Sequence, residues 1–282
     1  MAGLWHGHLP TSPVKLFVVL TLFPEAMEAY ADTSILGVAR QKGLVRTEFI
    51  DFRDFARDRH RTVDDRPFGG GPGMVLKPEP IAEAVEWAEA RHGACRKIAL
   101  CPSGRRFHQG VADEYLAEER ILFLCGRYEG FDERIVTVLG FEKLSLGEFV
   151  LAGGELPALC AIEAVARLVP GVLGDARSAM EDSYARRAPH EPGTQHATPK
   201  QQDGHGLLRP TSDGAPDLDH PHWTRPRVWR GAAVPEVLMG GDHAAIARFR
   251  AAEARRRQAL QDATPLNQPA PNATSARRTD SR

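Results

Sequence analysis

Short apolar segments alternate with amphipathic segments through the first part of the chain. The first apolar segment, Leu16–Phe23, is continuous and rich in β-branched and aromatic residues, which is typical of a strand covered on both faces. Further strands are predicted over Val45–Ile50, Lys97–Cys101 and Ile121–Cys125 and near Phe141–Leu146. Alternating strands and helices predict an α/β fold with a mainly parallel sheet over residues 14–175.

Helices are predicted between these strands. Pro24 suits the first turn of one helix, and Gly43 suits its end. The apolar residues of this helix are expected to be Met27, Tyr30, Ile35 and Val38. The other helices are predicted over Glu79–Arg91, Gln109–Ala117, Glu133–Leu139 and Leu156–Leu168.

The pattern changes in the C-terminal part of the chain. Residues 176–222 are predicted to form an interdomain linker with an insertion rich in proline, glycine and histidine. Helical patterning returns within residues 223–260 and predicts a small C-terminal helical domain. Residues 1–13 are predicted to form a loose leader and residues 261–282 a disordered tail.

Charge is divided unevenly along the chain. The 282 residues carry a formal net charge of -1, which argues against a uniform field that would attract nucleic acid or lipid. Residues 113–163, however, hold eleven acidic against four basic side chains, whereas residues 223–257 hold eight arginines against three acids. A basic module behind a linker indicates a polyanionic partner.

Two features bear on the cellular compartment. The longest apolar run, Leu16–Phe23, is too short to span a bilayer, so no membrane association is expected. The cysteines show no C-x-x-C pair and are interpreted as buried small hydrophobes in a reducing cytoplasm. They are Cys95, Cys101, Cys125 and Cys160. A cytoplasmic location is therefore predicted.

The segment Pro67–Gly73 contains four glycines and two prolines and cannot form a helix or a central strand. It lacks the Lys-Ser/Thr of a phosphate-binding Walker loop and the spacing of a dinucleotide fingerprint, which argues against a nucleotide-phosphate enzyme. Its composition fits a tight structural turn and a ligand-binding loop equally well.

Three further loops that contain glycine each follow a predicted strand: 101–104, 125–130 and 146–157. Ligands of open parallel sheets bind beyond the carboxyl ends of the strands. The loops together therefore predict one pocket, although each alone could be a simple strand-to-helix turn. Its expected apolar walls are Leu100, Leu146 and Leu151, and its expected acidic residue is Glu129.

Several stretches together resemble the bacterial tRNA (guanine-N1)-methyltransferases, which belong to the trefoil-knot (SPOUT) class. The stretches occur in the family's order and include two highly specific runs, Thr62–Met74 and Ser145–Pro157. The others are Leu22–Pro24, Cys125–Arg134, Ala164–Gly174, Glu181–Ser183, Pro221–Pro226 and Val234–Met239. The resemblance implies that the sheet carries a C-terminal trefoil knot.

The resemblance also implies that S-adenosylmethionine binds at the strand-end loops and serves as methyl donor. A cationic sulfonium favours a nearby carboxylate, for which Glu129 is the candidate. The implied cofactor-binding residues are Leu100, Pro102, Gly126, Tyr128, Glu129, Gly130, Leu146, Gly147, Glu148, Phe149, Val150, Leu151, Gly153, Gly154 and Pro157. A divalent cation is compatible with the resemblance, but no ligand cluster is visible in the sequence and no metal site is assigned.

The implied reaction methylates N1 of the guanosine 3′-adjacent to the tRNA anticodon, tRNA position 37. Asp182 is the expected general base for the N1 proton, and Arg167 is expected to stabilise the charge that grows on O6. Without the resemblance, Asp182 would be interpreted as a helix N-cap and Arg167 as a solvated helix-end residue. Glu181, next to Asp182, is a competing base.

Family members work as homodimers whose active site is shared between subunits, and the same is expected here. The tRNA-binding residues implied by the resemblance are Arg66, Gly70, Gly71, His222 and Arg225. The chain departs from its relatives in the length of the segment between Asp182 and His222, which is longer here. How this insertion affects the delivery of Asp182 is left open.

Two other functions remain as alternatives. A knot-type methyltransferase could act on another RNA atom such as a ribose 2′-hydroxyl, but that chemistry would favour a site without the Glu-Asp-Ser run at 181–183. A non-catalytic RNA-binding protein with the same fold would be expected to lack Asp182, Arg167 or the glycine-rich loop, and all three are present.

Overall fold

The computed structural model describes residues 14–175, 178–179, 182–185, 187–188, 209–210 and 218–263. The chain divides into two compact units. The sheet unit comprises Met1–Glu181 and Ala185–Pro210, and the C-terminal unit comprises Asp182–Tyr184 and Thr211–Arg282. Each unit is described by itself. The domain boundaries from the sequence stay predictions.

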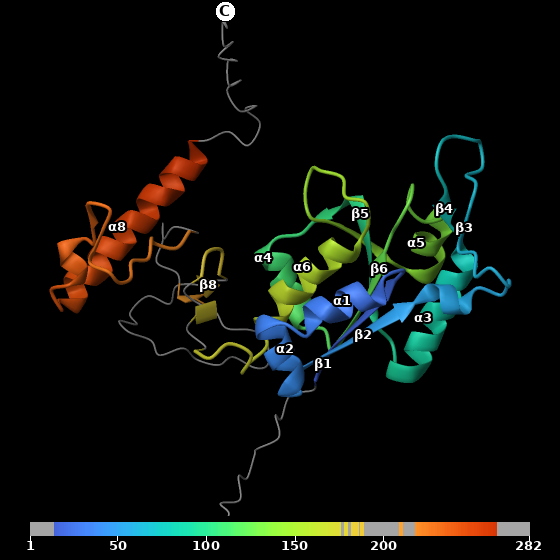
Figure 1. Ribbon diagram of the computed structural model, residues 1–282, viewed down its shortest axis with the longest axis horizontal. Coiled ribbons are helices and arrows are strands. Elements are labelled where there is room, and N and C mark those ends of the chain that lie inside the picture. Colours follow the sequence, from blue (N-terminus) through green and yellow to red (C-terminus); the bar gives the residue numbers. More distant parts are fainter. Residues whose placement is uncertain are drawn as a thin grey trace, which may run out of the picture. The chain divides into compact units, whose positions relative to one another are not determined.

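The sheet unit is built on a five-stranded sheet with the order β2-β1-β6-β5-β7 (Figure 1). Every neighbouring pair is parallel, which confirms the predicted α/β fold with a mainly parallel sheet. The strands are β1 (Lys15–Thr21), β2 (Val45–Asp51), β5 (Arg96–Arg106), β6 (Arg120–Cys125) and β7 (Glu142–Ser145). The trefoil knot implied by the resemblance stays a prediction.

Helices connect the strands close to the predicted positions. They are α1 (Pro24–Ala31), α2 (Ser34–Gln41), the 3-10 helix η1 (Phe52–Phe55), α3 (Pro78–His92), α4 (Gln109–Leu116), α5 (Glu133–Leu139) and α6 (Glu155–Ala166). Their starts follow from local chemistry: α3 begins at a proline, and the Asp132 side chain caps α5 by accepting a hydrogen bond from the Arg134 N–H.

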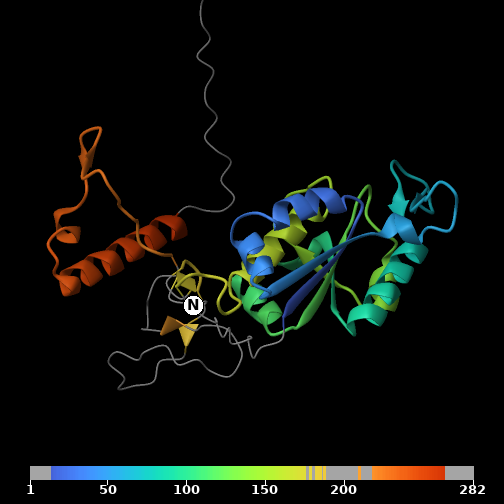
Figure 2. The same ribbon diagram turned by 60° about the horizontal axis from the view of Figure 1, so that its bottom comes forward.

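Alternate residues of the central strands point to opposite faces of the sheet, and each face has its own hydrophobic cluster. Phe17 and Val19 of β1 pack with α1, α2, α4 and α6. Val18 and Leu20 pack with η1, α3 and α5 on the other face. Figure 2 shows α1 and α6 on one side of the sheet and α3 on the other. Because both faces are covered, the strands are continuous apolar runs rather than alternating ones.

The single helix predicted from Pro24 to Gly43 is wrong in one respect, because the structure contains two helices. The chain leaves α1 at Asp32 and enters α2 at Ser34. A Cβ on Gly37 would lie 2.3 Å from the Asp32 carbonyl oxygen, so only glycine allows α2 to start this close to the end of α1.

The break also changes which residues form the core. Met27 is buried as expected, but Tyr30, Ile35 and Val38 are each more than 40% exposed. Ala31, Leu36 and Ala39 occupy the core in their place. A helical period counted across the break therefore assigned the wrong apolar face to α2.

Strand β5 is interrupted where the functional loops meet. Leu100 and Arg105 both pair with Leu144 of β7, so residues 101–104 loop out of the sheet between them. A Cβ on Gly104 would lie 2.4 Å from the Leu144 nitrogen, and glycine is therefore required where the strand returns to β7.

The described part of the C-terminal unit is dominated by one long helix, α8 (His243–Asp262). It is preceded by a short hairpin, β10 (Val228–Trp229) with β11 (Ala232–Ala233), and by the 3-10 helix η2 (Glu236–Leu238). Trp223 packs against Phe249 of α8 with ring centroids 5.7 Å apart. The helical prediction for this region is confirmed, whereas the hairpin was not predicted.

Two further pairs of short strands lie in the sheet unit. The hairpin β3 (Asp64–Asp65) with β4 (Val75–Leu76) encloses the glycine-rich segment. Strands β8 (Arg187–Ala188) and β9 (Arg209–Pro210) pair in parallel within the insertion. Most of the insertion, the leader at 1–13 and the tail from residue 264 lie outside the described residues. In the part of the chain that is described, no helix is both long and apolar enough to cross a bilayer.

Candidate functional site

A cavity of about 430 Å³ lies at the carboxyl ends of β5, β6 and β7. Its size and position are those of a small-molecule site in an open parallel sheet. It is lined by Leu100, Cys101, Pro102, Ser103, Gly126, Arg127, Tyr128, Glu129, Gly130, Phe131, Glu133, Lys143, Leu144, Ser145, Leu146, Gly147, Phe149, Val150, Leu151, Ala152, Gly153, Gly154 and Pro157. The three loops predicted to share one pocket therefore do so.

All residues expected from the resemblance to bind the cofactor line this cavity except Glu148. The Glu148 side chain is 73% exposed and pairs with Arg106, whose guanidinium nitrogen lies 2.5 Å from its carboxylate. The cofactor role of the lining residues stays a prediction, but their gathering in one cavity is a property of the fold.

Two glycines at the start of α6 let the loops after β6 and β7 approach each other. A Cβ on Gly154 would lie 2.7 Å from the Cys125 Cα, and one on Gly153 would lie 2.2 Å from the Arg127 Nε. The backbone nitrogen of Gly154 donates a hydrogen bond to the Gly126 carbonyl over 3.0 Å. Gly154 is needed because the backbone of the loop after β6 approaches it closely, whereas a Cβ on Gly153 would meet the side chains of Arg127 and Glu155.

A buried ion pair holds this side of the cavity. Arg127 contacts Glu155 with a nitrogen–oxygen distance of 2.9 Å, and Glu155 is only 8% exposed. The Thr21 hydroxyl, at the end of β1, donates to the other Glu155 oxygen over 2.9 Å. Arg127 also donates to the Ala152 carbonyl over 3.3 Å and lies over the Phe23 ring, 4.4 Å from its centroid.

The sequence alone does not indicate that Thr21, Arg127 and Glu155 form a group. Thr21 and Glu155 are 134 residues apart, so no local spacing connects them. An acidic residue at the start of a mostly apolar helix was the one available signal, because a buried carboxylate needs a partner.

Charges within the cavity lining are partly paired. Lys143 Nζ lies 2.8 Å from both carboxylate oxygens of Glu133. Glu129 is exposed and lies on the loop after β6. Next to it, Tyr128 has a φ of 57°, a left-handed conformation that is costly for a residue with a side chain. Such a conformation is common at ligand sites.

The glycine-rich segment is attached to the cavity loop at its base. The Glu129 N–H donates to the Met74 carbonyl over 3.0 Å, and the Leu76 N–H donates to the Gly130 carbonyl over 2.9 Å. Gly73 has a φ of 79°, and a Cβ there would lie 2.4 Å from Glu129 Oε1. The segment is therefore a hairpin loop whose base is hydrogen-bonded to the loop after β6, and a role in ligand binding stays a prediction.

The tip of the same hairpin projects away from this base. Phe68 is fully exposed, and Gly70 and Gly71 have positive φ values of 78° and 122°. Arg66, Gly70 and Gly71, the expected tRNA-binding residues of this loop, are exposed. None of residues 62–74, all of which the structure describes, lines the cavity.

The two expected catalytic residues do not lie in the cavity wall of the same chain. Arg167 follows the last residue of α6, whereas Pro157 lines the cavity from the first turn of that helix. Ten residues of helix separate the two by about 15 Å along the axis. Asp182 belongs to the C-terminal unit, and Glu181 lies outside the described residues.

The two residues after Asp182, Ser183 and Tyr184, are hydrogen-bonded to other residues of the C-terminal unit. The Ser183 hydroxyl accepts a hydrogen bond from the Asp219 N–H over 3.0 Å. The Gln261 side chain, on α8, donates to the Tyr184 hydroxyl over 3.0 Å. His222 and Arg225, the other expected tRNA-binding residues, are exposed in this unit.

The cysteines do not all follow the prediction of buried small hydrophobes. All four are free thiols, but only Cys125 is buried, and Cys160 on α6 is exposed. Burial strongly raises the pKa of the Cys125 thiol, so this residue behind the cavity stays protonated near neutral pH and is not a nucleophile.

Comparison with known proteins identifies the family. The sequence profile of the tRNA (guanine-1)-methyltransferase family TrmD matches residues 15–214 and 211–265. The chain belongs to this family. Two curated relatives are the tRNA (guanine-N(1)-)-methyltransferases of Dehalococcoides mccartyi strain CBDB1 and Myxococcus xanthus strain DK1622, each 45% identical. The first match covers 85% of both chains, and the second covers 86% of this chain and 85% of the relative.

A solved structure agrees with this assignment. The tRNA (m1G37) methyltransferase from Aquifex aeolicus is 34% identical and superimposes with a TM-score of 0.64. The match covers 89% of this chain and 92% of the Aquifex chain. Membership in the family favours guanine-N1 methylation over the 2′-hydroxyl chemistry and the non-catalytic role considered from the sequence.

Proposed function

We propose that this protein transfers a methyl group from S-adenosylmethionine to N1 of the guanosine 3′-adjacent to the anticodon of tRNA, position 37. The observation that carries the proposal is the single cavity into which the three strand-end loops bring the expected cofactor residues. The Aquifex aeolicus relative, described as an m1G37 enzyme, supports the nucleotide position. A cytoplasmic location fits this substrate.

The residues present fit S-adenosylmethionine. Leu100, Leu146 and Leu151 offer apolar surface to the adenine, and the backbone at Gly154 approaches the loop after β6 so closely that a Cβ would collide with it. Glu129 places a carboxylate at the same cavity, where it favours a cationic sulfonium. When bound, the cofactor supplies an electrophilic methyl group.

The protein's own contribution to the chemistry is proton removal and charge stabilisation. N1 of neutral guanine carries a proton, so its lone pair becomes available only when a base accepts that proton. We assign this role to Asp182. Negative charge then develops on O6 of the base, and we assign its stabilisation to the guanidinium of Arg167, which matches an oxyanion with directional hydrogen bonds.

A homodimer explains the position of Arg167. About 15 Å of helix separates it from the cavity of its own subunit, so a site shared between two subunits lets Arg167 and Asp182 act on a guanine placed beside the cofactor bound by the partner. The outer surface beside α6 supports such an interface. It exposes several large apolar side chains, namely Phe23, Tyr30, Ile35, Val38 and Leu156.

The cofactor would lie within the knotted segment of each subunit.

Binding of tRNA is assigned to two exposed regions. The first is the glycine-rich hairpin, with Arg66 and the backbone of Gly70 and Gly71. The second is the C-terminal unit, with His222, Arg225 and the arginines of α8. Most of these contacts would be to phosphates, and binding should weaken strongly with rising salt.

The decisive experiment incubates the protein with S-adenosylmethionine and a tRNA transcript that carries guanosine at position 37. Nucleoside mass spectrometry should detect N1-methylguanosine, and replacement of that guanosine by adenosine should remove the product. Detection of a 2′-O-methylated nucleoside, or of N1-methylguanosine that persists after the replacement, would overturn the proposal.

A further inference from the structure

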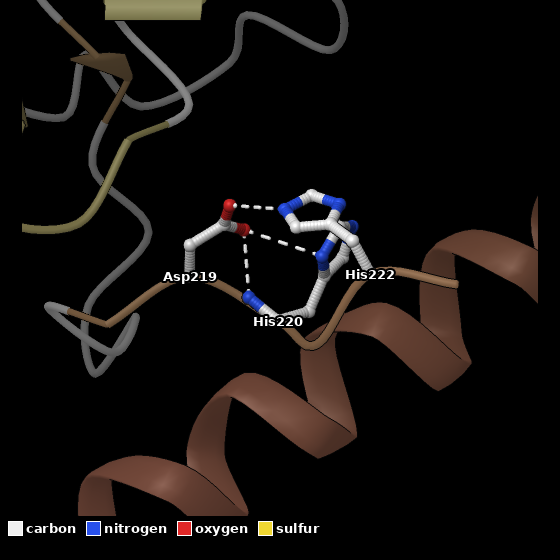
Figure 3. A group of neighbouring side chains, drawn as sticks. All are labelled: Asp219, His220 and His222. Carbon is white, nitrogen blue, oxygen red and sulfur yellow. Dashed lines mark hydrogen bonds and ion pairs between the residues drawn. The ribbon is translucent and has the colours of Figure 1, made fainter. Parts of the chain in front are cut away.

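Three potential metal ligands gather in the C-terminal unit, apart from the cavity described above. Asp219, His220 and His222 each offer one potential ligand atom, and these three atoms lie within 4.8 Å of one another. Figure 3 shows both imidazoles beside the Asp219 carboxylate. Asp219 Oδ2 lies 2.9 Å from His222 Nε2, and Asp219 Oδ1 lies 3.4 Å from His220 Nδ1. The two imidazole rings are close to perpendicular, with centroids 4.5 Å apart.

The cluster leaves one buried atom unsatisfied. The His220 side chain is 15% exposed, and its Nδ1 atom is buried and makes no hydrogen bond. It nevertheless points toward the carboxylate of Asp219, as Figure 3 shows. A buried polar nitrogen without a hydrogen bond costs about 1–3 kcal/mol, and the 3.4 Å contact of His220 Nδ1 with Asp219 is an ion pair only when the imidazole is protonated.

We propose that Asp219, His220 and His222 form a binding site for a divalent transition-metal ion of the zinc class. Two imidazole nitrogens with one carboxylate oxygen suit Zn²⁺, Co²⁺ or Ni²⁺, whereas Mg²⁺ prefers oxygen ligands. Ligand atoms about 2.0–2.1 Å from a tetrahedral ion lie about 3.3 Å from each other. The 2.9 Å and 3.4 Å contacts of Asp219 are made by its two different oxygens, and with one ligand atom per residue the three atoms lie within 4.8 Å of one another, so the ion would draw the ligands closer together.

A bound ion would restrict the motion of the segment 219–222, which carries these ligands. The Asp219 N–H donates to the Ser183 hydroxyl over 3.0 Å, and Arg257 of α8 donates to the Asp219 carbonyl over 3.2 Å. Fixing the Asp219 side chain therefore also restrains Ser183, the neighbour of Asp182. The site has a positioning role toward residues 182–184, and its existence does not depend on the proposed methyl transfer.

The alternative is an Asp–His hydrogen-bonded group that binds no ion. A second alternative is zinc binding elsewhere, since the linker contains further histidines at 190, 196 and 205. His222 is also an expected tRNA contact, so the metal titration is carried out without RNA. Substitutions of Asp219 and His222, compared with a substitution of a histidine outside the cluster, distinguish these alternatives.

The test uses the full chain without an oligohistidine tag and measures Zn²⁺ affinity by competition with a chromophoric chelator. One ion per chain is expected, and Mg²⁺ in large excess should not displace it. Asp219→Asn and His222→Ala should each weaken Zn²⁺ binding by about 10-fold or more. His222 is 71% exposed, so its removal should leave the fold intact, which far-ultraviolet circular dichroism checks.

His243→Ala is the matched control, because His243 is an exposed histidine of the same unit at the first position of α8. It should bind Zn²⁺ as the wild type does. Absence of stoichiometric binding, or equal affinity of the wild type and both cluster variants, would overturn the proposal. Hydrogen exchange supplies the second measurement: Zn²⁺ should slow exchange at residues 182–184 in the wild type but not in His222→Ala, and unchanged exchange would refute the positioning role.

Discussion

The sheet unit and the C-terminal unit differ in how their residues are held. Both faces of the sheet are covered by helices, and two separate hydrophobic clusters fill the space between them. In the described part of the C-terminal unit, only Ala254 is buried. Its helix α8 carries a mostly polar surface with five arginines between residues 248 and 257.

We propose that this difference corresponds to two kinds of binding. A small cofactor needs backbone groups fixed to within a fraction of an ångström, which dense packing behind the three loops provides. A nucleic acid is held mainly through phosphates, for which exposed arginines on a lightly packed scaffold are sufficient. We therefore expect substitutions to separate cofactor binding from tRNA binding according to the unit in which they lie.

The largest effect is expected from the C-terminal unit. Asp182→Ala should reduce kcat of methyl transfer by about 10²–10⁴-fold, because no base then removes the N1 proton. S-adenosylmethionine affinity should be unchanged, since residues 182–184 do not line the cavity. Radiolabelled methyl transfer and titration calorimetry measure the two quantities. Glu181→Ala is the control and should do much less; the reverse order of effects would assign the base to Glu181.

In the sheet unit, Gly154→Ala should affect cofactor binding first. The new Cβ would lie 2.7 Å from the Cys125 Cα and force apart the loops after β6 and β7. We expect S-adenosylmethionine affinity to fall by about 10-fold or more and stability to fall by about 1–3 kcal/mol. Calorimetry and thermal unfolding provide the measurements.

Gly174→Ala is the matched control for this substitution, because a Cβ there meets no atom within 4 Å. It should leave both quantities close to those of the wild type. If Gly154→Ala bound the cofactor normally but lost tRNA affinity, the assignment of the two ligands to the two units would fail.

A smaller effect is expected for Arg225→Gln in the C-terminal unit. Loss of one phosphate contact should weaken tRNA binding several-fold and reduce the slope of log affinity against log salt by about 0.7–0.9. Filter binding over a series of salt concentrations measures both. Arg46→Gln, which removes an exposed arginine that pairs with Glu48 in the sheet unit, should have little effect. Equal losses in the two variants would show that the protein binds tRNA through its overall charge alone.

The smallest effect concerns the packing of the sheet unit itself. Lys15 of β1 is 5% exposed, and its ammonium donates to the carbonyls of Tyr115, Leu116 and Glu118. Burial lowers the pKa of Lys15 from 10.5 to about 8. Between these two pH values the native protein has lost the proton and the unfolded chain still holds it, so this residue makes stability rise with pH across the window.

Lys15→Met should remove that rise. Thermal unfolding of the wild type and the variant between pH 8 and 10 should show Tm values that diverge by about 4–8 °C, which corresponds to about 2 kcal/mol. Other titrating groups are common to both proteins and cancel in the difference. Parallel pH profiles would mean that the burial of Lys15 does not shift its proton affinity.

Local patterns were sufficient for most of the sheet unit. Strands covered on both faces are uninterrupted apolar runs, and each of the five strands was predicted within a few residues of its position, except that β5 continues past its predicted end. The loops were predictable for a related reason, since glycines mark the places where the backbone must turn or approach closely. The same reasoning was wrong for α2, where the helical period was counted across the break at Asp32–Thr33.

Sequence alone determined the type and order of the elements, the glycine-rich loops and the resemblance to the tRNA (guanine-N1)-methyltransferases, because periodicity and motifs are properties of neighbouring residues. Only the tertiary structure decided which distant groups meet. It placed Thr21 against Glu155, separated Arg167 from the cavity by the length of α6, and joined Ser183 to Asp219. These contacts depend on the topology of the chain. They join residues far apart in the sequence, and the local spacing of residues therefore does not predict them.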